Sequence, residues 1–231
     1  MLSYFLSNSY NNGRIVQQEK HHSEQPIGAA ADRRSIRSRR ALLDAAERLF
    51  GERGVDAVSI DDLIASADVA KGTFYNHFDD KAALALAVVT SVRADAEALV
   101  AARNAGIIDP AQRCARALCV YAHFAAASPV RARALMHIET MTLGPDAAVN
   151  RGLRSDIEAG LASGVFHVPD RSAAMLYVSG LAGALIASAL IGGDPRRAGE
   201  AIVSMCLTGL GMRPDQAGAV AKAAMDDIAG S

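Results

Sequence analysis

Apolar residues recur along most of the chain at intervals of three and four, which is the spacing of one face of an α-helix. The clearest example is formed by Leu42, Ala45, Ala46, Leu49 and Phe50. No stretch shows the strict apolar–polar alternation of a half-buried strand bounded by turn residues. The pattern therefore predicts an all-α protein whose first amphipathic helix includes these five residues.

Polar residues and glycine mark where this first helix ends and where two shorter helices begin. Gly54 fits the C-terminal cap of the first helix. Ser59 comes directly before the next apolar run and has Asp62 three residues later, a variant of the capping box. Asp68 lies in a turn and can tolerate a left-handed backbone, and a third helix begins near Ala70. Two short helices, a tight turn and a supporting helix have helix–turn–helix geometry.

The third helix belongs to the stretch AKGTFYNHFDDK, residues 70–81, which presents two different faces. Phe74 and Phe78 are four residues apart and share the face that we predict to be buried. The outward face has no carboxylate; it carries Gly72, Thr73, Tyr75 and Asn76, with Lys71 and His77 at its flanks. Glycine permits close approach, and the polar groups can bond to phosphates and bases. The face suits a DNA major groove, although an ordinary polar helix surface can look similar.

Further helices are predicted from residue 81 to the end of the chain. Asp79 and Asp80 can cap a helix that ends near Arg103. The later spans are 110–127, 130–143, 146–163, a long apolar helix to 191, 196–210 and 214–228. The complete pattern predicts about ten helices.

The long apolar helix allows two interpretations. Residues 172–193 contain no charge and are long enough to span a membrane. Small residues at four-residue spacing would allow close helix packing in water or lipid; they are Ser179 with Gly183, and Gly180 with Ala184 and Ser188. Because glycines weaken the hydrophobicity and no basic flank follows, we expect a buried dimer helix. The alternative is a membrane-associated helical protein anchored by residues 172–193.

Charge is informative only locally. The 231-residue chain is 51% apolar and has a formal net charge of −1, so its overall charge does not indicate a nucleic-acid-binding protein. Five arginines nevertheless lie within eight positions: Arg33, Arg34, Arg37, Arg39 and Arg40. This cluster can lie along DNA phosphates or enter a minor groove, or it can be a solvated flank.

Residues 1–34 are expected to form a disordered tail, because their early part is rich in Asn, Gln, Ser and His without an apolar period. The start lacks a basic n-region and a long apolar run, so it does not read as a signal peptide. Three cysteines do not make a disulfide framework and favour a reducing compartment. A cytoplasmic protein is therefore expected.

Enzyme chemistry finds little support in the sequence. Cys119 and His123 lie four residues apart, so a thiolate–imidazole pair is geometrically possible. No nearby third group orients the histidine, and Cys114 lies off that helical face. Ligands on a single helix cannot close a site around zinc. We therefore expect no catalytic residues, no metal and no cofactor.

The motif Val69-x-x-Gly72-Thr73-Phe74-Tyr75-x-His77-Phe78-x-x-Lys81 resembles the signature of the TetR family of bacterial transcriptional regulators. The preceding LLDAAERLFGERGVDAVSIDDLIASADV also resembles the first two helices of that family. The resemblance implies a DNA-binding domain over 35–95, with its helix–turn–helix at 59–78. It also implies a ligand-binding and dimerisation domain over 96–231, nine or ten helices in all, and repression relieved by a small molecule.

The resemblance also implies the DNA contacts. Ser59 would meet a phosphate, Lys71 and Gly72 would open the recognition helix toward bases, and Thr73 and Tyr75 would contact the backbone or base edges. Asn76 could read an adenine, and His77 and Lys81 match phosphate-facing positions. The chain departs from the family at three positions, where it has Asp61 instead of Arg or Lys, Asp68 instead of Gly, and Ala70 instead of Ser.

The remaining expectations concern partners. The resemblance implies a homodimer through helices near 173–191 and 196–210, bound to a palindromic double-stranded DNA operator, with no membrane partner. A small, largely apolar effector would bind among the central C-terminal helices. Candidate ligand contacts are Tyr121, His123, Met136, His137, Glu139, Met141, Met175 and Tyr177.

Overall fold

The computed structural model describes residues 27–139, 150–192 and 195–229, and within them the chain is helical with no strand. The ten helices are α1 (Ile27–Arg53), α2 (Ile60–Ala67), α3 (Lys71–Tyr75), α4 (Lys81–Arg103), α5 (Pro110–Ala127), α6 (Pro129–Glu139), α7 (Arg151–Ala162), α8 (Arg171–Leu190), α9 (Pro195–Gly209) and α10 (Pro214–Ala229). The prediction of an all-α fold with about ten helices is confirmed.

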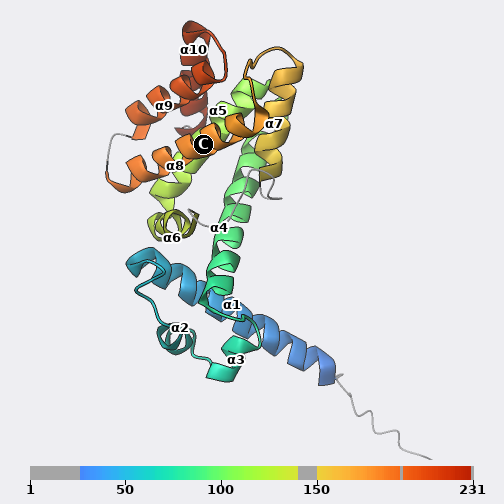
Figure 1. Cartoon of the computed structure of the whole chain (residues 1–231), viewed down its shortest axis with the longest axis vertical. Helices are drawn as coiled ribbons and strands as arrows, with labels where there is room; N and C mark the ends of the chain where they lie inside the picture. The colour runs from blue at the N-terminus through green and yellow to red at the C-terminus, as the bar shows by residue number, and fades with distance from the viewer. Residues whose placement is uncertain (1–26, 140–149, 193–194, 230–231) are drawn as a thin grey trace, which may run out of the picture.

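The helices form two groups that α4 connects (Figure 1). Helices α1, α2 and α3 lie together at one end, and α5 to α10 form a bundle at the other. Helix α4 runs from the first group into the bundle, and α6 packs directly on α1. The expected domain boundary at residue 95 falls within this continuous helix.

The core of the first group contains the apolar residues that the spacing predicted. Leu42, Leu49 and Phe50 of α1 are buried against Leu63 of α2. Phe74 and Phe78 are also buried, with their ring centroids 6.1 Å apart. The two phenylalanines hold the short α3 to the domain, since a five-residue helix has little stability of its own.

The predicted caps of this group are present. Ser59 accepts a hydrogen bond from the Asp62 amide at 3.1 Å, and its own amide donates to the Asp62 carboxylate at 2.9 Å. The Ser59 hydroxyl also donates to this carboxylate at 2.6 Å, and this bond and the bond from the Ser59 amide lower the pKa of Asp62. Gly54 follows α1 with φ +79°, and Asp68 ends α2 with φ 53°. Local side-chain chemistry therefore sets both ends of α2.

Helix α1 begins earlier than the expected boundary between tail and domain. It starts at Ile27, so residues 27–34 are helical, whereas we expected them to belong to a disordered tail. Alanine and arginine are strong helix formers, and both are frequent in this segment. Helix formation here did not need the apolar period on which the prediction relied. Residues 1–26 lie outside the described part of the chain.

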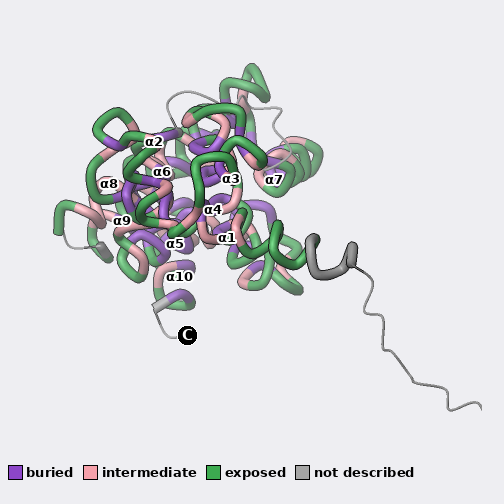
Figure 2. Tube along the Cα trace, turned by 90° about the horizontal axis from the view of Figure 1, so that it is seen from below, coloured by how far each residue is buried: buried purple, intermediate pink, exposed green. Residues whose placement is uncertain are grey.

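Helix α8 leaves much of its apolar surface uncovered. Among the described residues it is the helix whose length and composition would allow it to cross a membrane, and 28% of its most apolar stretch is buried. Val178, Leu185 and Ile186 pack into the bundle, while Leu176 is 59% exposed. Figure 2 shows buried and exposed positions alternating along the helices of this bundle.

Candidate nucleic-acid interface and ligand cavity

The outward face of α3 is exposed as the sequence predicted. Lys71, Gly72, Tyr75 and Asn76 are exposed, and Thr73 is half-buried. Tyr75 is 50% exposed, and the edge-to-face contact of its ring with Phe74, at 5.2 Å between centroids, holds it in place. The face therefore presents a positioned hydroxyl, an amide and an ammonium group to the outside.

Nothing in the structure of the chain requires a glycine at position 72. A Cβ atom built on it would meet nothing within 4 Å, and its φ is not positive. Neither crowding nor backbone strain explains a glycine in the first turn of this helix, where it weakens the helix by about 1 kcal/mol relative to alanine. Close approach of an outside partner would explain it.

Lys71 is paired with the acidic residue that departs from the family pattern. Its Nζ lies 3.3 Å from Oδ1 of Asp61 in α2, and both side chains are well exposed. An exposed pair of this kind contributes little to stability. Lys71 can therefore exchange Asp61 for a stronger anion at low cost.

His77 and Lys81 have structural roles that the sequence did not indicate. The His77 Nε2 atom lies 2.7 Å from Oγ of Ser38 in α1. Lys81 Nζ donates to the carbonyl oxygens of Val55 at 2.8 Å and Val58 at 2.9 Å. An ammonium group has three donors, so Lys81 keeps at most one for a phosphate. His77 and Lys81 therefore tie residues 70–81, which we call the recognition segment, to α1 and to the loop after α1.

We expect Lys81→Met to lower the free energy of unfolding by about 1–2 kcal/mol, because it removes two hydrogen bonds from a charged donor. Urea unfolding followed by circular dichroism measures this change. Lys71→Met is the matched control, and it should alter stability by less than about 0.5 kcal/mol because its ion pair is exposed. Equal stability of the two variants would contradict a structural role for Lys81.

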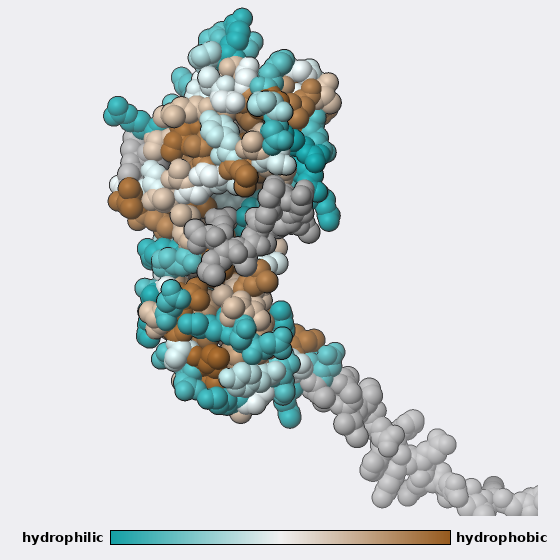
Figure 3. Space-filling view, in the orientation of Figure 1, coloured by the Kyte–Doolittle hydropathy of each residue, from teal (hydrophilic) through white to brown (hydrophobic). Residues whose placement is uncertain are grey.

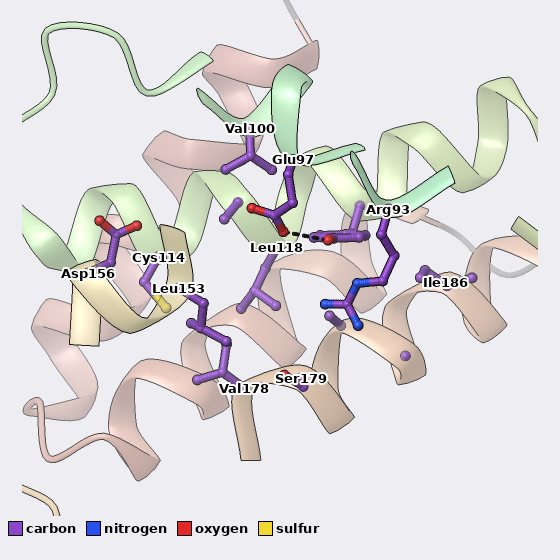
Figure 4. A pocket seen from close by; sticks show the side chains of 14 residues that line it. Arg93, Glu97, Val100, Cys114, Leu118, Leu153, Asp156, Val178, Ser179 and Ile186 are labelled. Carbon is purple, nitrogen blue, oxygen red and sulfur yellow. Dashed lines mark hydrogen bonds between the residues drawn. The ribbon is translucent and has the colours of Figure 1, made fainter. Parts of the chain in front are cut away.

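A small cavity lies within the C-terminal bundle, between α4, α5, α7 and α8 (Figure 4). Its volume is about 40 Å³. Arg93, Glu97 and Val100 line it from α4, and Leu153 and Asp156 line it from α7. The other lining residues are Cys114, Ala117, Leu118 and Tyr121 of α5, and Val178, Ser179, Ala182, Gly183 and Ile186 of α8. The cavity is thus mostly apolar and has few charged groups.

The charged groups of the cavity are bound by neighbouring side chains. Tyr121 donates its hydroxyl proton to Oε1 of Glu97 at 2.6 Å. Burial raises the pKa of Glu97, and the hydrogen bond from Tyr121 and the positive charge of Arg93 partly offset this effect. The Arg93 guanidinium in turn donates to Oδ1 of Asn150 at 2.8 Å.

A second carboxylate lies across the cavity from this group (Figure 4). Asp156 accepts a hydrogen bond from Nε of Arg113 at 2.5 Å. Burial raises the pKa of Asp156, while Arg113 lowers it. The cavity therefore has acceptors at two separated places, with apolar side chains between them.

Of the eight candidate ligand contacts, Tyr121 lines this cavity. His123 is exposed on the outside of α5, and Met175 is buried in the core without reaching the cavity. Tyr177 is partly exposed and donates its hydroxyl to the Met205 carbonyl at 3.0 Å. The prediction of a site among these helices did not identify which faces point inward, because helix packing decides that.

The candidates on and after α6 do not line the cavity either. Met136 is half-buried, and the His137 Nδ1 atom lies 2.8 Å from the Phe50 carbonyl oxygen. His137 therefore contacts α1, at the junction of the two helix groups. The Glu139 side chain and the whole of Met141 lie outside the described part of the structure.

Sequence reasoning missed Arg93, Glu97 and Asp156, although one signal was present. Arg93 and Glu97 interrupt the apolar face of α4 that also includes Val89, Val92 and Val100. Charged residues on an otherwise apolar helical stripe are rarely buried unless they have partners. The two charges on this stripe could have indicated a polar site inside the bundle.

The thiolate–imidazole pair considered for catalysis does not form. Cys119 is buried, and its thiol donates to the sulfur of Met225 at 3.2 Å. Burial raises the pKa of the Cys119 thiol to about 12, whereas His123 is exposed on the surface. Among the described residues, no three His, Cys, Asp or Glu side chains gather as a metal site would require.

The model for "Bacterial regulatory proteins, tetR family" matches residues 42–88, which include the helix–turn–helix and its exposed face. Residues 42–88 therefore form a DNA-binding region of the tetR type. One curated relative is the HTH-type transcriptional repressor DhaR of Mycobacterium sp. (strain GP1), 42% identical over 45 residues. The Transposon Tn10 TetC protein of Escherichia coli is 49% identical over 41 residues. These matches cover 20% and 18% of this chain.

The chain spans less than a quarter of the length of these curated relatives, because the matches cover 23% and 21% of them. Solved structures extend the likeness to the whole fold. The structure of RolR in complex with the ligand resorcinol has a TM-score of 0.56 at 25% identity, over 82% of this chain and 95% of that one. A gamma-butyrolactone receptor (ArpA-like protein) has a TM-score of 0.61 at 18% identity, over 86% and 100%, and supports the fold alone.

Proposed function

We propose that this chain is a homodimeric transcriptional repressor that a small, largely apolar molecule releases from a palindromic DNA operator. Residues 35–95 would bind DNA, and residues 96–231 would bind the ligand and dimerise. The observation that carries the proposal is the outward face of α3, which lies within the family match. No catalytic role is proposed, and the cytoplasm is the compartment in which such a regulator meets DNA.

The DNA contacts follow from exposure and chemistry. Tyr75 and Thr73 supply hydroxyl groups for phosphates or base edges, and Asn76 supplies an amide suited to adenine. Gly72 permits close approach to the groove, for which the interior of the protein offers no other reason. Lys71 would leave Asp61 for a guanine or a phosphate. Ser59 lies at the N-terminus of α2, where a phosphate is favoured.

Two copies of α3 are needed because one recognition helix covers too few base pairs for operator specificity. In helix–turn–helix dimers the two half-sites lie about 34 Å apart, or one turn of DNA. We assign the dimer interface to the uncovered face of α8 and the adjoining face of α9. Leu176 and Gly180 are exposed on α8, and Met205 of α9 is 63% exposed.

The interface uses one of the two predicted rows of small residues. Ser179 and Gly183 line the cavity, so the first row faces the bundle interior. Gly180 and Ala184 are exposed, and they share a face with Leu176. A second helix could therefore approach α8 closely along this stripe, as small residues allow.

A membrane anchor accounts less well for α8. One face of the helix is buried against its own bundle by Val178, Leu185 and Ile186. Its neighbours carry exposed ion pairs, such as Arg196 with Asp226 and Arg213 with Asp215. Carrying these charges into hydrocarbon would be costly. A second copy of the chain would cover the apolar stripe of α8 without moving these charges into hydrocarbon.

The cavity supports a ligand with an apolar body and polar ends. Glu97 and Asp156 can accept hydrogen bonds, and Arg93 can donate them, around a wall of aliphatic side chains. RolR, whose structure contains resorcinol, shows that a related fold accepts a small aromatic diol. The present volume of about 40 Å³ is below the roughly 150 Å³ that accommodates benzene. Binding would therefore widen the cavity and shift α4, which begins beside the recognition segment.

Selection of DNA by the purified protein from a pool of random 40-base-pair duplexes tests this function. We expect an enriched palindrome, bound in fluorescence anisotropy by two protomers. Tyr75→Ala should weaken binding to that duplex about tenfold, because a lost DNA contact costs roughly 1–3 kcal/mol.

Ile108→Ala is the matched control for this test, because Ile108 is the most exposed large apolar side chain among the described residues and lies in the loop before α5. This variant should bind like the wild type. The absence of any enriched sequence for the wild type would refute the proposed function, and unchanged binding by Tyr75→Ala would refute the assigned face.

A further inference from the structure

The N-terminal part of α1 is a charged helical segment that projects from the domain. Residues 32–37 are six consecutive exposed positions on a helix. Since six residues cover every direction around the helix axis, no face of this segment packs on the protein. Figure 1 shows this end of α1 extending past α3, and Figure 2 shows it as exposed.

The projecting segment is attached to the end of the recognition segment. Ser38 Oγ lies 2.7 Å from Nε2 of His77. The Arg39 guanidinium lies over the Phe78 ring, 5.3 Å from its centroid, which is within the range of a cation–π contact. These two contacts hold the α1 segment beside the face that would enter the major groove.

The charge of this segment is strongly positive and largely uncompensated. Residues 32–40 contain five arginines and a single acid, Asp32, in a chain whose net charge is −1. Arg40 pairs with Asp44 at 2.8 Å. Arg33, Arg34 and Arg37 are exposed and have no carboxylate partner among the described residues. Figure 3 shows hydrophilic surface over this end of the molecule.

We propose that residues 32–40 of α1 are a second DNA-contacting element, which binds the phosphates that flank the α3 site. This inference rests on the proposed function. A polyanion complements the arginine charge, and the contacts with His77 and Phe78 make the segment continuous with the α3 face. Arg33 and Arg37 share one side of the helix, while Arg34 is turned by about 100°. Side chains spread in this way suit phosphates on both sides of a groove better than a row of base edges.

The length of the segment sets its reach on DNA. The six helical steps from Asp32 to Ser38 rise roughly 9 Å at 1.5 Å per step. This distance corresponds to about three base pairs at 3.4 Å each. Each protomer would therefore protect about three base pairs beyond the half-site that α3 covers.

The test compares the wild type with the triple variant Arg33→Gln, Arg34→Gln and Arg37→Gln on the duplex selected from the random pool. Glutamine has nearly the helix propensity of arginine, so α1 is retained. We expect binding at 0.15 M salt to weaken 10- to 100-fold. The slope of log affinity against log salt should fall by about 2–3 per protomer, since each lost phosphate contact contributes about 0.9.

The matched control is Arg151→Gln, Arg171→Gln and Lys222→Gln, which removes the same charge from exposed positions of the C-terminal bundle. It should leave the salt slope unchanged. Shortening the duplex to the two half-sites, without the three base pairs that flank each of them, should weaken the wild type and leave the Arg33/Arg34/Arg37 variant unaffected.

A wild-type salt slope in the Arg33/Arg34/Arg37 variant would overturn the inference while leaving the proposed function standing. Loss of binding by this variant to phosphatidylserine vesicles, without any change on DNA, would also overturn it. Failure of the wild type to select any duplex is a different result, because it refutes the proposed function itself.

Discussion

Gly180→Arg is expected to convert the protein from a dimer into a monomer and to weaken operator binding about 1,000-fold. Gly180 is exposed on the apolar stripe of α8, and a Cβ atom there meets nothing within 4 Å of its own chain. A monomer can therefore carry the arginine, but a closely packed partner helix cannot. Without the second recognition helix, binding falls toward the non-specific level, which is typically 10³-fold or more weaker.

Sedimentation equilibrium, circular dichroism and fluorescence anisotropy on the selected duplex measure these effects. The helical signal of Gly180→Arg should be retained, because Gly180 is exposed and α3 packs on α1 and α2. Ala219→Arg, at an exposed position of α10, is the matched control and should remain a dimer that binds its operator. If Gly180→Arg stays dimeric with normal affinity, α8 is not the interface.

Gly51→Ala is expected to lower the free energy of unfolding by about 2–3 kcal/mol, and the melting temperature by roughly 4–12 °C. A Cβ atom on Gly51 would lie 2.3 Å from the carbonyl oxygen of Val130 and 2.8 Å from its Cγ1. Relief requires the start of α6 to move, because the closest atom belongs to the backbone. Arg131 opposes that movement, since it binds Glu47 at 3.0 Å and Asp95 at 2.6 Å.

Gly218→Ala is the matched control for this substitution. A Cβ atom on Gly218 would meet only the Ser204 hydroxyl, at 3.9 Å, which is an ordinary contact. Alanine should therefore stabilise α10 by about 0.5–1 kcal/mol. Thermal unfolding at one protomer concentration compares the two variants. A stabilised Gly51→Ala protein would contradict tight packing between α1 and α6.

The helix–turn–helix could be predicted because its signals are local. Ser59 and Asp62 form their reciprocal cap from residues three apart, and Asp68 adopts the left-handed backbone that its turn requires. The spacing of Phe74 and Phe78 places both on the buried face of one short segment. Such features depend on neighbours within one helical turn, so the sequence displays them directly.

The ligand cavity could be placed only in its general region. Its walls come from four helices, and the inward faces depend on how those helices rotate against one another. Arg93 and Glu97 are inside, whereas His123 faces outward, although all three belong to helices that the pattern predicted. Neighbouring residues cannot specify a cavity that forms between segments far apart in the chain.

The sequence by itself determined the helical class, the caps and buried face of the recognition region, and the polar groups that α3 presents. These depend on local propensity and on the 3.6-residue period. Only the tertiary structure decided that Lys81 binds the carbonyls of Val55 and Val58. It alone also decided that Gly183 faces the cavity while Gly180, three residues earlier, is exposed. Both outcomes follow from contacts between distant segments, whose geometry is set when the helices pack.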